Sequence, residues 1–178
     1  MSKVLAIDTS TSRTSVAIIE NGMVVFSGFR DGATAHGPSL PALVQEALAI
    51  SDVDEVVVGM GPGPFTGLRV GIAFAQSFAL AREIPVRGVC SLDAIAAQVT
   101  DKDFIITVDA RRKEVYWARY VGGVRVAEPA VNFPADVTGA NIHADLFPDM
   151  KALVNLSGDI KEPIYLRRPD AVATADRP

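Results

Sequence analysis

The sequence predicts an α/β protein built from two lobes, each of which opens on three β-strands. Asn21-Gly22 joins two runs rich in Val, Ile and Phe, and this dipeptide is the strongest short-range signal of a β-hairpin because both positions tolerate positive φ. Another apolar run precedes them at residues 4–8. A similar succession of three extended segments begins again at residue 104, which predicts that the same unit occurs twice.

Strands and amphipathic helices alternate over the first part of the chain. We expect strands at residues 4–8, 14–19, 23–29, 55–60 and 86–89, and helices at residues 39–50, 66–82 and 91–99. Pro41 fits only the first turn of its helix, because later turns need the N–H that proline lacks. Thr66 and Ser91 are placed to cap the helices that follow.

The rest of the chain repeats the β-β-β start and then becomes irregular. Strands are expected at residues 104–108, 114–120 and 124–126, followed by short helices and loops and a last strand at residues 164–166. We therefore divide the chain into a first lobe, residues 1–100, and a second, smaller and degenerate lobe, residues 101–178. Two β-β-β-α units in succession are typical of the actin, sugar kinase and heat-shock ATPase superfamily. The order of elements thus predicts an actin-like, ribonuclease H-like fold.

Composition and charge limit the classes of function. Hydrophobic residues make up 49% and charged residues 21% of the chain, as in an ordinary globular protein. A net charge of −4, without any block of like charges, argues against a stand-alone nucleic-acid binder. Cys90 is the only cysteine, which excludes an internal disulfide and a thiolate metal cluster. No signal-peptide core or long apolar run is present, so we expect a cytoplasmic protein without a membrane partner.

Two loops stand where ATPases of this superfamily hold phosphate. In those enzymes an Asp is followed by Gly, so that backbone N–H groups approach the phosphates closely. Here Asp8 is followed by Thr9 and Ser10, and Asp109 by an alanine and two arginines. Hydroxyl groups of the first loop can contact phosphate, and the alternative is that Asp8 only ends a strand and caps the next turn. We treat Asp8, Thr9, Ser10 and Asp109 as degenerate phosphate-loop candidates and expect no cofactor.

The sequence shows no catalytic or metal site. The glycine-rich loop at residues 61–67 lacks a Gly-Lys-Ser or Gly-Lys-Thr ending, and its two prolines remove backbone donors, so we favour a structural role over an anion site. The two histidines, His36 and His143, are too far apart for a His-x-x-x-His metal pair. No Gly-x-Ser-x-Gly elbow occurs.

The long helix at residues 66–82 predicts a surface for a second polypeptide. It is apolar almost all round, and a sheet can cover only one of its sides. A strip of small side chains that recur every four residues would permit close approach by a partner. The expected interface residues are Leu40, Leu43, Val44, Ala47, Gly67, Gly71, Phe74, Ala75, Phe78 and Ala79. We expect Ala75→Arg to abolish pairing without loss of the fold.

Four blocks of the sequence, taken in order, resemble the TsaB family. They are VLAIDTS from residue 4, GMGPGPFTGLRVG from residue 59, VDARRKEVYWA from residue 108 and EPIYLR from residue 162. The stretch at residues 125–161 matches loosely and is shorter than usual in the family. The resemblance therefore implies an actin-like fold whose second lobe is shortened.

The resemblance implies a bacterial, non-catalytic subunit of the machinery that makes threonylcarbamoyladenosine in tRNA. In that family picture a TsaD-like enzyme transfers threonylcarbamoyl from threonylcarbamoyl-AMP to the adenosine adjacent to the anticodon, and a TsaE-like ATPase assists. TsaB proteins meet TsaD through the two first-lobe helices, and tRNA is reached through the complex. The basic patch at residues 111–113 is interpreted as a solvated turn, with tRNA contact as the alternative.

Two other hypotheses remain open from the sequence. One is a small kinase or hydrolase of the same superfamily that uses Asp8 and Asp109 across the cleft, with its own nucleotide site. The other is a homodimer that uses the same two helices symmetrically.

Overall fold

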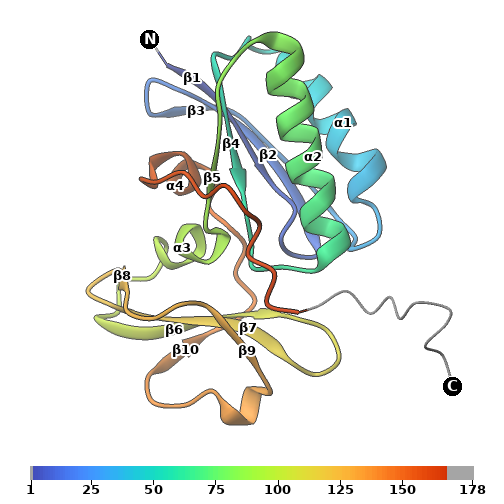
Figure 1. Ribbon diagram of the computed structural model, residues 1–178. Coiled ribbons are helices and arrows are strands. Elements are labelled where there is room, and N and C mark those ends of the chain that lie inside the picture. Colours follow the sequence, from blue (N-terminus) through green and yellow to red (C-terminus); the bar gives the residue numbers. More distant parts are fainter. Residues whose placement is uncertain (1, 168–178) are drawn as a thin grey trace, which may run out of the picture.

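The computed structural model describes residues 2–167, which form two β-sheets separated and flanked by helices (Figure 1). The first sheet has the strand order β3-β2-β1-β4-β5. Its strands are β1 (Lys3–Asp8), β2 (Arg13–Glu20), β3 (Met23–Asp31), β4 (Glu55–Gly59) and β5 (Val86–Val89). The first three strands pair antiparallel, and β4 and β5 continue the sheet parallel to β1. Asn21 and Gly22 both have positive φ, so the predicted hairpin is confirmed.

Helices cover both faces of the first sheet. On one face lie α1 (His36–Leu48) and α2 (Phe65–Arg82), and on the other lie α3 (Ser91–Ala96) and α4 (Met150–Asn155) (Figure 1). Because side chains alternate along a strand, Leu5 of β1 packs under α1 and α2 while Ala6 packs on the α4 side. Both faces are buried, which explains the unbroken valine run of β4.

The second sheet has the strand order β10-β6-β7-β8, with β9 paired to β7. Its strands are β6 (Asp103–Asp109), β7 (Val115–Val121), β8 (Val124–Arg125), β9 (Ala130–Asn132) and β10 (Asn141–His143). The 3-10 turn η1 (Pro134–Asp136) stands between β9 and β10, where the first unit carries the helix α1. A hydrophobic core joins the two sheets. It consists of side chains of α3 and of the side chains of β6 and β7 that face them.

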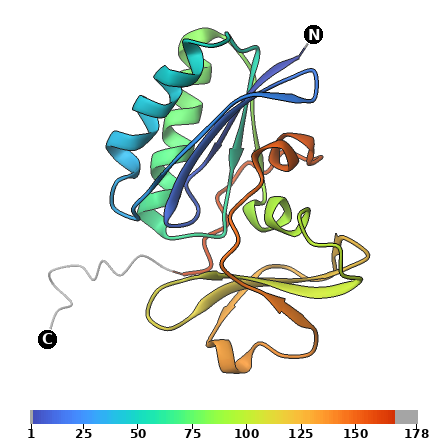
Figure 2. The ribbon, with the colours of Figure 1, turned by 180° about the vertical axis from the view of Figure 1, so that it is seen from behind.

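The last described stretch returns to the first sheet and runs along both sheets (Figure 2). Met150 and Leu153 of α4 pack on β1 and β2. Backbone hydrogen bonds then join Ile160 to Gly88 and Ile164 to Met60. The expected strand at residues 164–166 is therefore wrong, because these residues make isolated contacts instead of a ladder. The division into residues 1–100 and 101–178 stays a prediction, and residues 168–178 lie outside the described residues.

Three local expectations are also corrected. Helix α1 begins at His36, one turn earlier than expected, so Pro41 lies inside the helix. The N-cap of α2 is Pro64 and no side chain caps this helix, so Thr66 belongs to its first turn. Ser91 does not cap α3, because its hydroxyl group donates to a carboxylate elsewhere in the fold. No described helix is long and apolar enough to cross a membrane.

Candidate functional site

The first candidate phosphate loop is closed by hydrogen bonds within the chain. Asp8 ends β1 and is 1% exposed. Its Oδ1 accepts hydrogen bonds from Ser10 N at 2.9 Å and Ser10 Oγ at 2.7 Å. Its Oδ2 accepts one from Ser91 Oγ at 2.6 Å. Both carboxylate oxygens are thus engaged by protein groups at the position where an active ATPase would face phosphate.

Thr9 is held in the same way by helix α2. Its Oγ1 donates to the carbonyl oxygen of Gly67 at 2.7 Å, and the residue is 1% exposed. A Cβ at Gly67 would lie 2.8 Å from Thr9 O, and one at Gly71 would collide with Thr9 Oγ1. These two glycines therefore allow α2 to lie against the loop after β1. The loop has no room for a phosphate between Thr9 and α2.

Burial raises the pKa of Asp8 above its ordinary value of 3.8, and the hydrogen bonds from Ser91 and Ser10 oppose this rise. A raised folded pKa means that the folded state holds the proton more tightly than the unfolded state. The contribution of Asp8 to the free energy of unfolding is therefore largest at low pH and is lost as the pH rises from 3.8 through the raised pKa. A carboxylate that is costly to ionise in the fold is poorly suited to hold a magnesium nucleotide.

The variant Asp8→Asn tests this pH dependence. Its amide does not titrate, so its free energy of unfolding relative to the wild type should increase as the pH rises above 3.8 and level off above the folded pKa of Asp8. Urea unfolding of both proteins from pH 4 to pH 8 measures this difference, in which all shared titrating groups cancel. A difference that is flat or falls with pH would contradict the buried, closed carboxylate.

The second candidate loop lies between β6 and β7 and is open to solvent. Asp109 is exposed, and its Oδ1 accepts a hydrogen bond from Arg111 N at 2.8 Å. Arg111, Arg112 and Lys113 all have positive φ, at 61°, 54° and 65°. Asp109 lines a cavity of about 230 Å³ with Thr11, and Asp8 does not belong to this lining. The described residues therefore do not bring Asp8 and Asp109 into one site.

Neither histidine stands in a metal site. His36 Nδ1 lies 2.8 Å from Thr14 Oγ1 in the core, and burial lowers the pKa of its imidazole. His143 Nε2 lies 3.0 Å from Asp101 Oδ2, which holds the pKa of that carboxyl below its ordinary value. Within residues 2–167 no group of three His, Cys, Asp or Glu side chains is placed to hold a metal ion.

Most of the interface residues expected on α1 and α2 are buried within the protein. All ten expected interface residues except Phe74 and Phe78 are buried, and those two are half-buried. Within the chain, Gly67 and Gly71 of the strip of small residues on α2 lie close to Thr9, and Gly67 also lies close to His36. Contact of these ten residues with a partner stays a prediction that the chain alone does not test.

The opposite side of α2 is partly or fully exposed and largely uncharged, with the exposed Arg69 one turn before Ala73. We call Val70, Ala73, Phe74, Ser77, Leu80 and Ala81 the outer face of α2. These residues lie three and four positions apart, so they form one stripe along the helix. Leu80 is 81% exposed, and Ile50, just beyond the end of α1, is 63% exposed. Of this face, only Phe74 is among the interface residues expected from the sequence, because the small residues drew attention to the other side.

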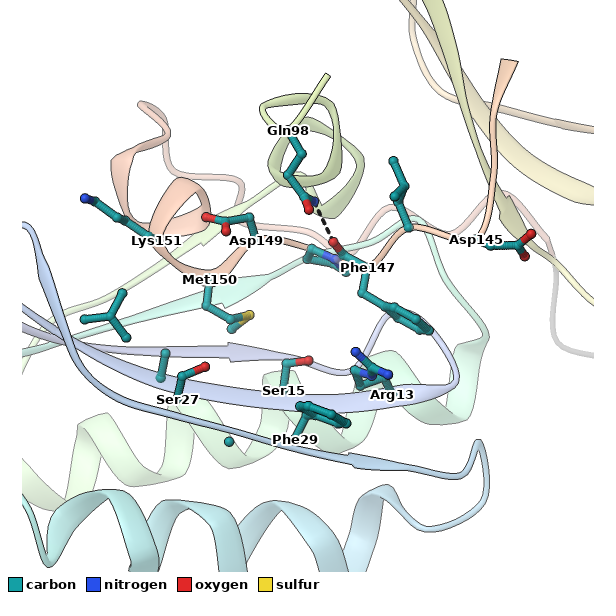
Figure 3. Close-up of a pocket in the computed structure, with 15 residues that line it drawn as sticks. Arg13, Ser15, Ser27, Phe29, Gln98, Asp145, Phe147, Asp149, Met150 and Lys151 are labelled. Atoms are coloured by element: carbon teal, nitrogen blue, oxygen red, sulfur yellow. Dashed lines mark hydrogen bonds between the residues drawn. The ribbon is translucent and has the colours of Figure 1, made fainter. Parts of the chain in front are cut away.

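A cavity of about 360 Å³ lies on β2 and β3 beside α4 (Figure 3). The guanidinium of Arg13 stands between the rings of Phe29 and Phe147, 3.9 and 3.8 Å from their centroids, and pairs with Asp31 at 2.8 Å. Gln98 donates to the carbonyl oxygen of Phe147 at 2.7 Å (Figure 3). These contacts fix the loop before α4 on the first sheet. No local sequence pattern indicates this cluster, because its members are far apart along the chain.

The protein has an α/β fold of the actin-like type, as predicted. The ethanolamine utilization protein EutJ from Carboxydothermus hydrogenoformans matches 72% of the chain with a TM-score of 0.50 at 12% identity, which shows the fold alone. A structure described as YeaZ from Pseudomonas aeruginosa has a TM-score of 0.73 at 28% identity and covers 86% of this chain and 89% of that one. Another Pseudomonas aeruginosa protein, described as similar to peptidase YEAZ, has a TM-score of 0.79 at 27% identity, covering 94% of this chain and all of that one.

The family model described as "TsaD: tRNA N6-adenosine threonylcarbamoyltransferase" matches residues 31–169, and the chain belongs to this family as a TsaB homologue. The Escherichia coli protein named tRNA threonylcarbamoyladenosine biosynthesis protein TsaB is 37% identical over 127 residues, or 66% of this chain and 54% of that protein. The chain thus spans about half the length of the TsaB-named relatives that it matches. An uncharacterized Mycobacterium tuberculosis protein is 44% identical over 96% of this chain and 94% of its own length.

Proposed function

We propose that the chain is a non-catalytic, cytoplasmic subunit of the tRNA threonylcarbamoyladenosine machinery. In this role it binds a TsaD-like enzyme, and the pair receives a TsaE-like ATPase. The observation that carries the non-catalytic role is the closed loop after β1, where Ser10 and Ser91 satisfy both oxygens of Asp8. The names of the relatives support the pathway.

The outer face of α2 supports a binding role. A largely uncharged stripe with a leucine 81% exposed is an unfavourable surface to leave in water, and such patches mark protein interfaces. Ile50, which follows α1, enlarges this apolar surface. The ion pair between Arg82, at the end of α2, and Asp52 holds the ends of the two helices together. We therefore place the TsaD-like partner on this face, in place of the buried strip expected from the sequence.

A complementation experiment tests the pathway and the non-catalytic role together. Deleting the gene in the organism that carries it should abolish threonylcarbamoyladenosine in its tRNA, as measured by nucleoside mass spectrometry. Both the wild-type gene and the Asp8→Asn variant should restore it, because the carboxylate of Asp8 takes part in no reaction. Normal levels of the modified nucleoside after deletion would refute the pathway.

The kinase or hydrolase alternative is decided by the same variant. If the isolated chain turned over ATP with magnesium and Asp8→Asn abolished this turnover, the loop would have to open and the chain would be an enzyme. Failure of Asp8→Asn to restore the modified nucleoside, with unchanged protein levels, would point the same way.

A further inference from the structure

A third cavity, of about 620 Å³, lies between the start of α2 and the turn that joins β6 to β7. Its lining includes Phe65 and Gly67 from α2, Arg111 from the turn, and Tyr116 and Tyr165. It is distinct from the closed loop, since Asp8 and Thr9 do not line it. Its volume is in the range of pockets that hold a small ligand or one unit of a polymer.

The cavity has a cation available on its wall. The Arg111 side chain is exposed, and within residues 2–167 its guanidinium makes no hydrogen bond or ion pair. By contrast, the guanidinium of Arg167 is already paired with Glu114 and donates to Ala110 O.

The start of α2 adds backbone donors on the opposite wall. No side chain caps this 18-residue helix, and its first hydrogen bond runs from Leu68 N to Pro64 O. The preceding helical N–H groups, including those of Phe65 and Gly67, thus lie at the positive end of the helix dipole, where an anion is stabilised. Together with Arg111 they offer a phosphate both charge and hydrogen bonds.

An aromatic pair stands beside these donors. The rings of Phe65 and Tyr165 are 5.0 Å apart at 41°, and Tyr165 is 36% exposed. The Arg69 guanidinium lies 4.0 Å from the centroid of Phe65 and donates to Tyr165 Oη at 3.3 Å. Arg69 therefore covers one face of the Phe65 ring and holds both rings in place, and the two rings together give the cavity an aromatic surface. Such surfaces stack with nucleic-acid bases of any sequence.

We propose that this cavity binds one nucleotide of single-stranded RNA, with its phosphodiester between Arg111 and the start of α2 and its base on the Phe65–Tyr165 pair. A phosphodiester carries one negative charge and needs no metal ion. That the RNA is tRNA rests on the proposed function, whereas the binding itself does not.

The net charge of −4 is compatible with this site, because the cations are local and the rest of the surface repels RNA. We therefore expect weak binding by the isolated chain that strengthens as the salt concentration falls. In a complex, a partner with its own RNA contacts would raise the effective concentration at this cavity.

Fluorescence anisotropy with a labelled single-stranded RNA dodecamer at low salt tests the proposal. Arg111→Gln should weaken binding about tenfold and reduce the slope of log affinity against log salt by about 0.7. Phe65→Leu should weaken binding at least about fivefold without changing the slope, because it removes stacking and no charge. Arg30→Gln, an exposed arginine on β3 that is paired with Glu46, is the matched control and should behave as the wild type.

Thermal unfolding of each variant shows whether it is folded, and co-elution with a TsaD-like partner shows whether the proposed function still holds. No binding by the wild type at low salt, or equal effects of Arg111→Gln and Arg30→Gln, would overturn the RNA site while leaving the scaffold role intact. Displacement of the dodecamer by AMP at equal nucleotide concentration would also overturn it, since the site would then prefer free nucleotides.

Discussion

Replacing Leu80 with arginine is expected to abolish pairing with a TsaD-like partner while the chain stays folded. Leu80 is 81% exposed, so in the free protein the new guanidinium lies in water and should change the free energy of unfolding by less than about 0.5 kcal/mol. In a complex across the outer face of α2 the same charge would be buried without a counter-ion. This costs about 3 kcal/mol, which weakens binding roughly a hundredfold.

Size-exclusion chromatography of the mixed proteins, followed by titration calorimetry, measures the loss. Val124→Arg is the matched control, because Val124 on β8 is 67% exposed and far from α2 in the fold. Pairing by the Leu80→Arg variant that equals pairing by the control would show that the partner binds elsewhere. If the free chain is a concentration-dependent dimer that Leu80→Arg makes monomeric, the same face also serves a homodimer.

The variant Ala75→Arg separates the outer face from the strip of small residues. The sequence led us to expect loss of pairing with an intact fold, but Ala75 is fully buried against the first sheet. An arginine there would enter a packed core with an unpaired charge, so we now expect the circular dichroism signal of the folded protein to be lost. A folded but unpaired Ala75→Arg protein would restore the original interpretation of the strip.

Local patterns predicted most of the first sheet and its helices. The Asn-Gly turn, the valine run of β4 and the apolar spacing of α1 each depend on residues close together in the chain, and each element is present in the structure. The predicted bounds differ by a few residues at most, chiefly at the start of α1 and at the end of α3, which stops at Ala96. His36 is buried against Thr14 and begins that helix earlier than the apolar pattern indicates.

The face of α2 that points inward was not predictable in the same way. Small residues and larger apolar residues both mark a side of this helix as suitable for contact, and periodicity alone does not say which side meets the sheet. The choice depends on Thr9, whose backbone and hydroxyl fit only against Gly67 and Gly71. That fit involves residues about sixty positions apart, so it can be recognised only in the folded structure.

The closed state of the candidate phosphate loop also could not be predicted from the sequence. The missing glycines after Asp8 and Asp109 correctly suggested that the loops are altered, but a nucleotide contact by Thr9 or Ser10 remained open. It is Ser91, expected only as a helix cap, that occupies Asp8 Oδ2. Likewise, the cavity beside Arg111 combines residues from α2, the β6–β7 turn and the end of the described chain.

The second prediction with a large expected effect concerns Gly59, which ends β4 beside the closed loop. A Cβ at this position would collide with Asp8 Oδ2 and would lie 2.5 Å from Ser91 Oγ. Neither group can move away freely, because Ser10 and Ser91 hold the carboxylate from both sides. Gly59→Ala should therefore destabilise the fold by about 3 kcal/mol, which lowers the melting temperature by roughly 6–12 °C for a chain of this size.

Calorimetric melting of Gly59→Ala and of a control, Gly37→Ala, measures this effect. Gly37 lies in the first turn of α1 with open space around its Cα, so alanine there should raise stability by up to about 1 kcal/mol. Removing the carboxylate should relieve the collision, so the double variant Gly59→Ala with Asp8→Ala should lose less stability than the sum of the two single variants. Additive losses, or a Gly59→Ala protein as stable as the wild type, would mean that Asp8 stands free of β4. The loop could then admit a phosphate, and the principal support for a non-catalytic role would be gone.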